Sequence, residues 1–223
     1  MKQETRRRGR FLAGFGVYFV ALWLLWNTPV AYPLKLFVVL LHESSHGLVA
    51  VATGGRIEGI VLTSDQGGLC RCPGGNAFLT LSAGYLGSLA WGALIVRAAL
   101  LRGTWARAST GVLGAGALIV SALYLRNGFG LAFGLAFGAA LVGAARYLNV
   151  EANRVLLNVL GLTSCLYAIL DIKSDILERP HLTSDAAMLA GLTGIPTLVW
   201  GILWIGIALF ASWRLFRWAY RRA

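Results

Sequence analysis

The chain of 223 residues is 57% hydrophobic and only 13% charged, whereas ordinary soluble domains carry about 25% charged residues. This composition excludes a typical soluble fold, and it predicts one all-α polytopic membrane domain over residues 1–223. The net charge of +11 would suit a protein that binds nucleic acid, but the basic residues cluster in the tails 1–10 and 214–223. Arginine at the ends of apolar spans is typical of contact with the lipid bilayer, so we expect no nucleic-acid partner.

Seven apolar runs approach the length of a membrane-spanning helix, which predicts six or seven hydrophobic helices. The runs are Phe11–Trp26, Pro33–Ala52, Ala77–Leu101, Ala108–Leu125, Phe129–Ala145, Val155–Leu170 and Ile195–Ser212. We expect both basic tails on the cytoplasmic side of the membrane. Two tails on the same side require an even number of crossings. Phe129–Ala145 is short and rich in glycine, so we expect it to be the incomplete span. With seven crossings the Lys and Arg residues divide equally between the two sides, which leaves the orientation open.

The second apolar run contains the motif HExxH at residues 42–46. On a helix, His42 and His46 lie one turn apart and can bind one Zn²⁺, while Glu43 can act as the general base toward water. Ionisable side chains at bilayer depth are costly and therefore rare. The motif predicts zinc chemistry within a membrane.

Residues 54–76 form a polar loop after the second run and predict a small β-hairpin. Arg56–Thr63 is rich in β-formers, residues 64–68 supply a turn, and Leu69–Cys72 is the return strand. Its exposed edge could pair with an unwound substrate peptide, or the hairpin could simply connect two helices. Cys70 and Cys72 lack a second pair for a zinc site, so we interpret them as a solvent-facing pair with no shared function.

Small residues recur along two of the apolar runs. Gly84, Gly87, Ser88 and Gly92 fall on one side of the third run, and Gly130, Gly134 and Gly138 repeat every four residues in the fifth. Small residues at this spacing allow membrane helices to approach closely. We interpret both patterns as helix packing without chemistry.

A catalytic zinc usually has three protein ligands, and the third must come from outside the HExxH motif. Four acidic residues late in the chain are the candidates: Asp171, Asp175, Glu178 and Asp185. Asp171 directly follows an apolar run, where an unpaired carboxylate would be costly, and it is the preferred ligand. Asp175, one turn further on, is the alternative, or it orients a ligand imidazole. His181 follows Pro180 in a polar loop and is expected at the surface.

The segments LLHESSHGLVAVATGGRIEGI, SAGYLGS, YAILDIKSDIL and SDAAMLAGLTGIP resemble those of the site-2 protease family of intramembrane zinc metallopeptidases. The closest similarity is to the short branch without a PDZ domain. The resemblance implies that His42 and His46 are zinc ligands, that Glu43 is the base and that an aspartate of a later helix completes the site. In that family the aspartate often stands in a Leu-Asp-Gly motif, whereas Leu170-Asp171 is followed here by Ile172.

These observations predict a multi-pass intramembrane metalloprotease that uses Zn²⁺ to hydrolyse peptide bonds in transmembrane protein substrates. The small size and simplicity of the chain predict a bacterial plasma membrane. Two alternatives belong to other classes. A non-catalytic, site-2 protease-like membrane scaffold would keep the motif without cutting, and a small-molecule transporter would account for the many glycine-rich spans. The sequence leaves the oligomeric state and the substrate open.

Overall fold

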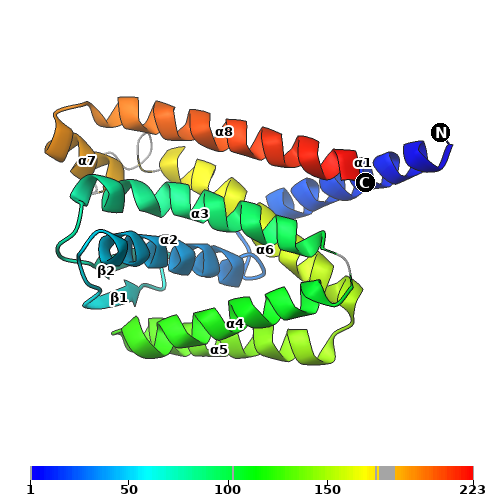
Figure 1. The fold of residues 1–223 in the computed structure, drawn as a ribbon, viewed down its shortest axis with the longest axis horizontal. Coiled ribbons are helices and arrows are strands. Elements are labelled where there is room, and N and C mark those ends of the chain that lie inside the picture. The colour runs from blue at the N-terminus through cyan, green and yellow to red at the C-terminus, as the bar shows by residue number, and fades with distance from the viewer. Residues whose placement is uncertain (1, 102, 174, 176–183, 223) are drawn as a thin grey trace.

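The computed structural model describes residues 2–222 except 102, 174 and 176–183. The described residues form a helical membrane bundle with one small hairpin after the second helix (Figure 1), as the composition predicts. The elements in chain order are α1 (Lys2–Leu25), α2 (Tyr32–Ala52), β1 (Gly59–Leu62), β2 (Gly68–Arg71), α3 (Ala77–Ala99), α4 (Trp105–Tyr124), α5 (Gly128–Tyr147), α6 (Val150–Lys173), α7 (Asp185–Thr193) and α8 (Thr197–Arg222).

Six of the described helices are long and apolar enough to span a membrane, namely α2, α3, α4, α5, α6 and α8. The prediction that Phe129–Ala145 is the incomplete span was wrong, because α5 is a full helix of 20 residues. The short apolar segment is instead Leu12–Leu25 in α1. The basic tails are also not separate from the helices, since α1 begins at Lys2 and α8 continues to Arg222.

The bundle has two ends, which we call the terminal end and the hairpin end. At the terminal end lie both chain termini (Figure 1), and the Arg97 guanidinium of α3 stacks over Trp218 of α8. The hairpin end holds β1, β2, α7 and the start of α8 (Figure 1). Helix α1 begins at the terminal end, and α2 leads to the hairpin end (Figure 1). By length and composition the described residues give six candidate spans, and the apolar part of α1 is shorter than any of them.

The hairpin is fixed to the rest of the bundle through its first strand. β1 and β2 pair antiparallel, with Ile60 opposite Cys70. The side-chain amide of Asn127 donates to the carbonyl of Leu62 (2.6 Å) and accepts from its N–H (3.2 Å). The N–H of Arg126 also donates to the carbonyl of Ile60. The loop between α4 and α5 therefore occupies the far edge of β1 and leaves β2 as the edge strand.

Close helix contacts explain the glycine patterns. Around α4 and α5, a Cβ on Gly114 would lie 2.8 Å from the backbone oxygen of Gly138, and one on Gly138 would lie 3.0 Å from the backbone of Gly114. Around α3 and α6, a Cβ on Gly92 would lie 2.7 Å from the backbone oxygen of Gly161. These positions admit no side chain because backbone faces backbone there, so the packing interpretation of the glycines is confirmed in these two helix pairs.

We expect Gly114→Ala to lower the stability of the protein in detergent by about 1–3 kcal/mol, the usual cost of overpacking. Gly116→Ala on the same helix is the matched control, because nothing lies within 4 Å of a Cβ there. Both variants gain the same helix propensity, so the difference between them isolates the α4–α5 contact. Thermal unfolding followed by circular dichroism measures it, and equal melting temperatures would contradict the assignment.

Candidate metal centre

The HExxH motif lies on α2, with most of its side chains buried. Pro33 stands in the first turn of α2, where its missing N–H costs no helical hydrogen bond. Glu43 and His46 are only 6% and 7% exposed. The motif's serines are satisfied within the helix, since Ser44 and Ser45 donate to the carbonyls of Leu40 and Leu41. The polar groups of the motif that point away from the helix are therefore the two imidazoles and the carboxylate.

The described structure brings Asp185, rather than Asp171, to the two histidines. Its Oδ2 atom lies 3.0 Å from His42 Nε2 and 3.1 Å from His46 Nε2. The three donor atoms lie within 4.8 Å of one another. Donor atoms about 2.0–2.1 Å from a tetrahedral zinc are roughly 3.3 Å apart. The distances from Asp185 to the two imidazoles are close to this value, and the three residues form a candidate metal site.

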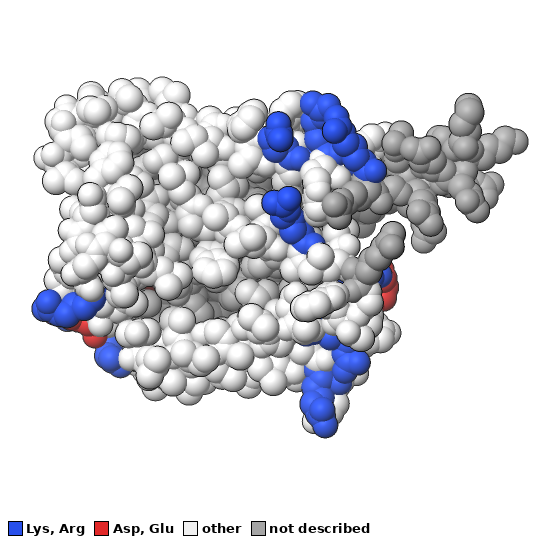
Figure 2. Space-filling view, in the orientation of Figure 1, with Lys and Arg blue, Asp and Glu red and all other residues white. Residues whose placement is uncertain are grey.

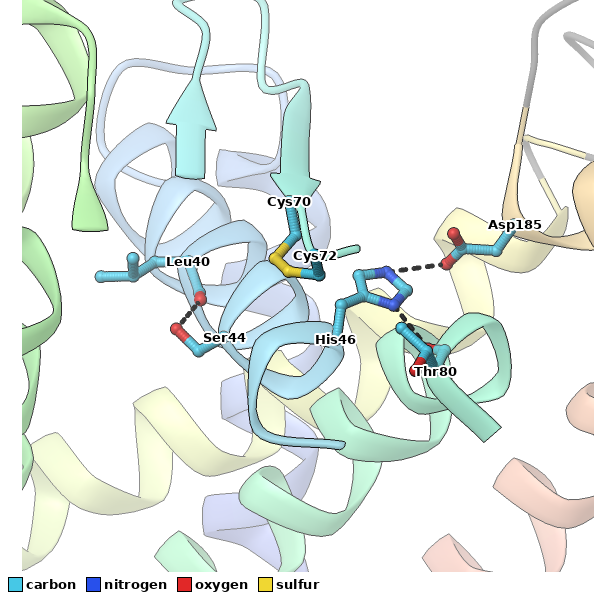
Figure 3. The surroundings of a disulfide bond; sticks show 7 residues. All are labelled: Leu40, Ser44, His46, Cys70, Cys72, Thr80 and Asp185. Atoms are coloured by element: carbon cyan, nitrogen blue, oxygen red, sulfur yellow. Dashed lines mark hydrogen bonds and ion pairs between the residues drawn. A yellow bond between two sulfur atoms is a disulfide. The ribbon is translucent and has the colours of Figure 1, made fainter. Parts of the chain in front are cut away.

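His46 is held in the tautomer that a metal ligand requires. Its Nδ1 atom lies 2.7 Å from the backbone oxygen of Thr80 in α3. The oxygen can only accept, so Nδ1 donates to it, and Nε2 is the ring nitrogen that faces Asp185 and that would bind a metal once it has lost its proton. Figure 3 shows the ring of His46 between Thr80 and Asp185. This backbone contact orients the imidazole independently of any ion.

The short helix α7 positions Asp185. The Ser184 hydroxyl accepts from the N–H of Ala187 and caps the helix, and Gly194 ends it with a φ of 73°, which favours glycine. Ala186 and Leu189 are fully buried in a cluster with Trp200 and Trp204 of α8. This apolar packing fixes the first turn of α7 against α3, so that Asp185 points at the imidazoles.

The surroundings of Asp185 favour its ionised form. Burial on its own would raise the pKa of the Asp185 carboxyl. The hydrogen bonds and charges of His42 and His46 outweigh burial and hold this pKa below its ordinary value. A carboxylate is the form that binds a metal cation.

The small residues of α3 have a second role at the site. A Cβ on Gly84 would collide with His42 Nε2 and would lie 2.6 Å from His46 Nε2. A Cβ on Gly87 would likewise collide with Ser45 on α2. The interpretation of this pattern as packing without chemistry was therefore incomplete, because Gly84 creates the space in which both imidazoles lie.

Asp171 and Asp175 line the same cavity of about 550 Å³ as the three donors, but neither belongs to the donor cluster. Asp175 accepts a hydrogen bond of 2.5 Å from the Tyr85 hydroxyl. Tyr85 is 2% exposed, and its ring packs edge-on against that of His42, with centroids 5.1 Å apart. Asp175 thus contacts the Tyr85 hydroxyl, and the ring of Tyr85 lies against the His42 imidazole. Glu178 and His181 lie outside the described residues.

Strand β2 reaches the site from the other side. The backbone N–H of Cys70 donates to the Glu43 carboxylate, and a Cβ on Gly68 would collide with the same carboxylate. Cys70 and Cys72 are joined by a disulfide (Figure 3), and both line the cavity. The interpretation of these cysteines as a solvent-facing pair with no shared function was therefore wrong.

Fold and site together define a polytopic membrane protein that carries an HExxH helix in its interior. Residues 15–215 match the family model described as Peptidase M50B-like, and the chain belongs to this family. The match confirms the resemblance to the site-2 protease family, and the chain is a site-2 protease-like membrane protein. Comparisons with curated proteins and with solved structures returned no match.

We expect Asp185→Asn to lose most of the bound zinc, because it removes the charge of the carboxylate that, among the described residues, lies against both imidazoles. Asp171→Asn is the matched control, since it changes a carboxylate of the same cavity that is not among the donors, and it should retain zinc near the wild-type level. Zinc quantification on the purified proteins measures both. Zinc loss in Asp171→Asn with retention in Asp185→Asn would restore the original assignment of the third ligand to Asp171.

Gly84→Ala should also lose zinc, because its methyl group occupies the space of the two Nε2 atoms. The change adds one carbon and no charge, so a loss of metal at an unchanged melting temperature of the zinc-free protein would isolate this steric effect. Metal content and thermal unfolding of the chelator-treated protein are the measurements. Wild-type zinc content would show that α3 can move away from α2 at this point.

Proposed function

We propose that the protein is an intramembrane zinc endopeptidase that hydrolyses peptide bonds in transmembrane segments of other membrane proteins. The observation that carries the proposal is the convergence of His42, His46 and Asp185 in a cavity that also holds Glu43. Two imidazoles, one carboxylate and a neighbouring glutamate are the groups that zinc-dependent hydrolysis requires. Membership in the Peptidase M50B-like family supports the same reaction class.

In this proposal His42, His46 and Asp185 hold the ion, and Asp175 with Tyr85 orients His42. Zinc, when bound, activates water for attack and polarises the carbonyl group of the substrate. Glu43 accepts the proton of the attacking water and passes it to the leaving amine. The N–H of Cys70 fixes the carboxylate for this transfer.

The edge of β2 supports the proposal for how a substrate is held. A peptide bond in a helix is shielded by its own hydrogen bonds, so a transmembrane segment must unwind before it is cut. Among the described residues β2 has a strand partner only on the β1 side. Glu43 occupies part of the other edge, because it accepts from the N–H of Cys70. An extended segment that pairs with the rest of this edge would lie beside Glu43. Its partners would then be a membrane protein and the surrounding lipid.

Two functions from other classes compete with hydrolysis. The presence of His42, His46 and Asp185 together, and the contact between Glu43 and β2, argue against a non-catalytic scaffold. A protein that only binds partners needs neither feature. A transporter requires polar groups along a route across the membrane, whereas the described carboxylates and imidazoles within the bundle gather in one cavity at the hairpin end. The assignment to a bacterial plasma membrane stays a prediction from the size and simplicity of the chain.

We expect Glu43→Gln to lower the cleavage rate by about 10²–10⁴-fold, the usual contribution of a general acid–base group, while zinc content stays near the wild-type level. The assay uses purified protein reconstituted in liposomes with a panel of single-span membrane proteins, and cleavage is followed by gel mobility and mass spectrometry. Asp171→Asn serves as a control that changes one carboxylate of the cavity without removing the base. A Gln variant that cuts at the wild-type rate would falsify the role of Glu43, and a zinc-loaded wild type that cuts nothing would favour the scaffold.

A further inference from the structure

A second cavity lies apart from the metal centre. It has a volume of about 650 Å³ and begins at the terminal end, where its wall includes Leu100 after α3, Glu151 of α6 and Ala219 of α8. It shares no lining residue with the cavity that holds the HExxH motif. Sites for small molecules are commonly about 300–1,000 Å³ in volume, so this cavity is large enough for a ligand.

Helix α1 forms one wall of this second cavity, which we call the terminal cavity. The Tyr18 hydroxyl lies 3.0 Å from the Thr163 hydroxyl of α6. The ring centroid of Phe15 lies 4.9 Å from that of Phe216 in α8. Beside these contacts Gly14 lines the terminal cavity, and nothing lies within 4 Å of a Cβ there. Space therefore remains between α1 and the two helices that it touches.

The walls of the terminal cavity are largely apolar. Rings come from Phe15, Phe19 and Phe216, and aliphatic side chains of α6 come from Leu162, Leu166 and Ile169. Apolar cavities exclude water, and lipid tails are as apolar as leucine. Within a membrane, an acyl chain is therefore a ligand that these walls fit.

The mouth of the terminal cavity is basic. Figure 2 shows Lys and Arg side chains concentrated toward the terminal end. Glu151, the one described acidic residue at this end of α3, α6 and α8, forms an ion pair of 3.3 Å with Arg154. Guanidinium groups suit phosphate, and basic residues beside membrane spans attract anionic lipids. The described arginines at this end of the three helices are Arg97, Arg154, Arg214, Arg217 and Arg221.

Ser212 of α8 adds a polar group to the wall of the terminal cavity. Its hydroxyl oxygen is buried and has no hydrogen-bond partner among the described residues. A transmembrane helix offers few free carbonyls to such a hydroxyl, because its backbone groups bond to one another. The ester carbonyls of a phospholipid are free to accept. Ser212 therefore favours a lipid over a peptide helix as the occupant.

We propose that the terminal cavity binds one anionic phospholipid, with an acyl chain against the rings of α1 and α8 and the phosphate among the arginines. The glycerol esters lie between these two parts, and Ser212 donates to an ester carbonyl. The bound lipid joins α1 to α6 and α8. The proposal depends neither on the metal centre nor on proteolysis.

Native mass spectrometry of the purified full chain in mild detergent measures the binding, with phosphatidylglycerol and phosphatidylcholine of the same acyl chains added separately. Gly14→Leu fills the terminal cavity from α1, whereas Gly16→Leu adds the same side chain to the same helix outside the cavity. Nothing lies within 4 Å of a Cβ at either glycine, so neither change collides with a neighbour at that point. We expect the wild type and Gly16→Leu to retain one phosphatidylglycerol in preference to phosphatidylcholine, and Gly14→Leu to lose it.

Arg97→Gln should weaken phosphatidylglycerol binding about fivefold, the usual effect of one basic residue near an anionic lipid. Arg56→Gln at the hairpin end should leave this binding unchanged. Equal retention of the two lipids by the wild type, or equal phosphatidylglycerol binding by Gly14→Leu and the wild type, would overturn the proposal. Displacement of the lipid by an equimolar synthetic transmembrane peptide would also overturn it, because the terminal cavity would then be a peptide site. The comparison of the two lipids on the wild-type chain is decisive even where Gly14→Leu does not fold.

Discussion

The close approach of α3 to α2 is the constraint on which the rest of the site depends. HExxH places two imidazoles on one face of α2, but they can share an ion only if the neighbouring helix leaves room for their rings. Gly84 provides that room, and Gly87 lets the backbones stay close one turn further along. The same approach brings the carbonyl of Thr80 to His46 and the ring of Tyr85 to His42. One glycine-rich helix face therefore creates the space and also supplies groups that contact both imidazoles.

Asp185 lies on a short helix that does not span the membrane, and apolar packing holds this helix in place. Helix α7 has nine residues, too few to cross a membrane, and its buried Ala186 and Leu189 pack against the tryptophans of α8. A carboxylate at bilayer depth is unfavourable unless it is paired. Asp185 is paired with two imidazoles, and Asp175 accepts from Tyr85. The polar groups of the cavity thus satisfy one another in surroundings that are otherwise apolar.

The hairpin joins the chemistry of the site to its surroundings. The loop between α4 and α5 occupies one edge of the small sheet, and the strand on the other side contacts Glu43. Strand β1 is anchored to the bundle and therefore holds β2 at the cavity, beside Glu43. This arrangement accounts for a hairpin between two hydrophobic helices better than a simple connection would, because a connection needs no contact with the motif.

The sequence by itself determined the membrane class, the approximate helices, the hairpin and the three residues of the HExxH motif, since these follow from composition, periodicity and spacing along the chain. It also contained a signal for Asp185 in the segment SDAAMLAGLTGIP, but nearness to an apolar run favoured Asp171. Only the tertiary structure showed which carboxylate lies against the two imidazoles, because the place of a distant segment depends on how α7 packs on α3 and α8. The short apolar length of α1 is visible in the sequence, whereas the places of α1 and α2 in the bundle are seen only in the tertiary structure, because they depend on packing between distant segments.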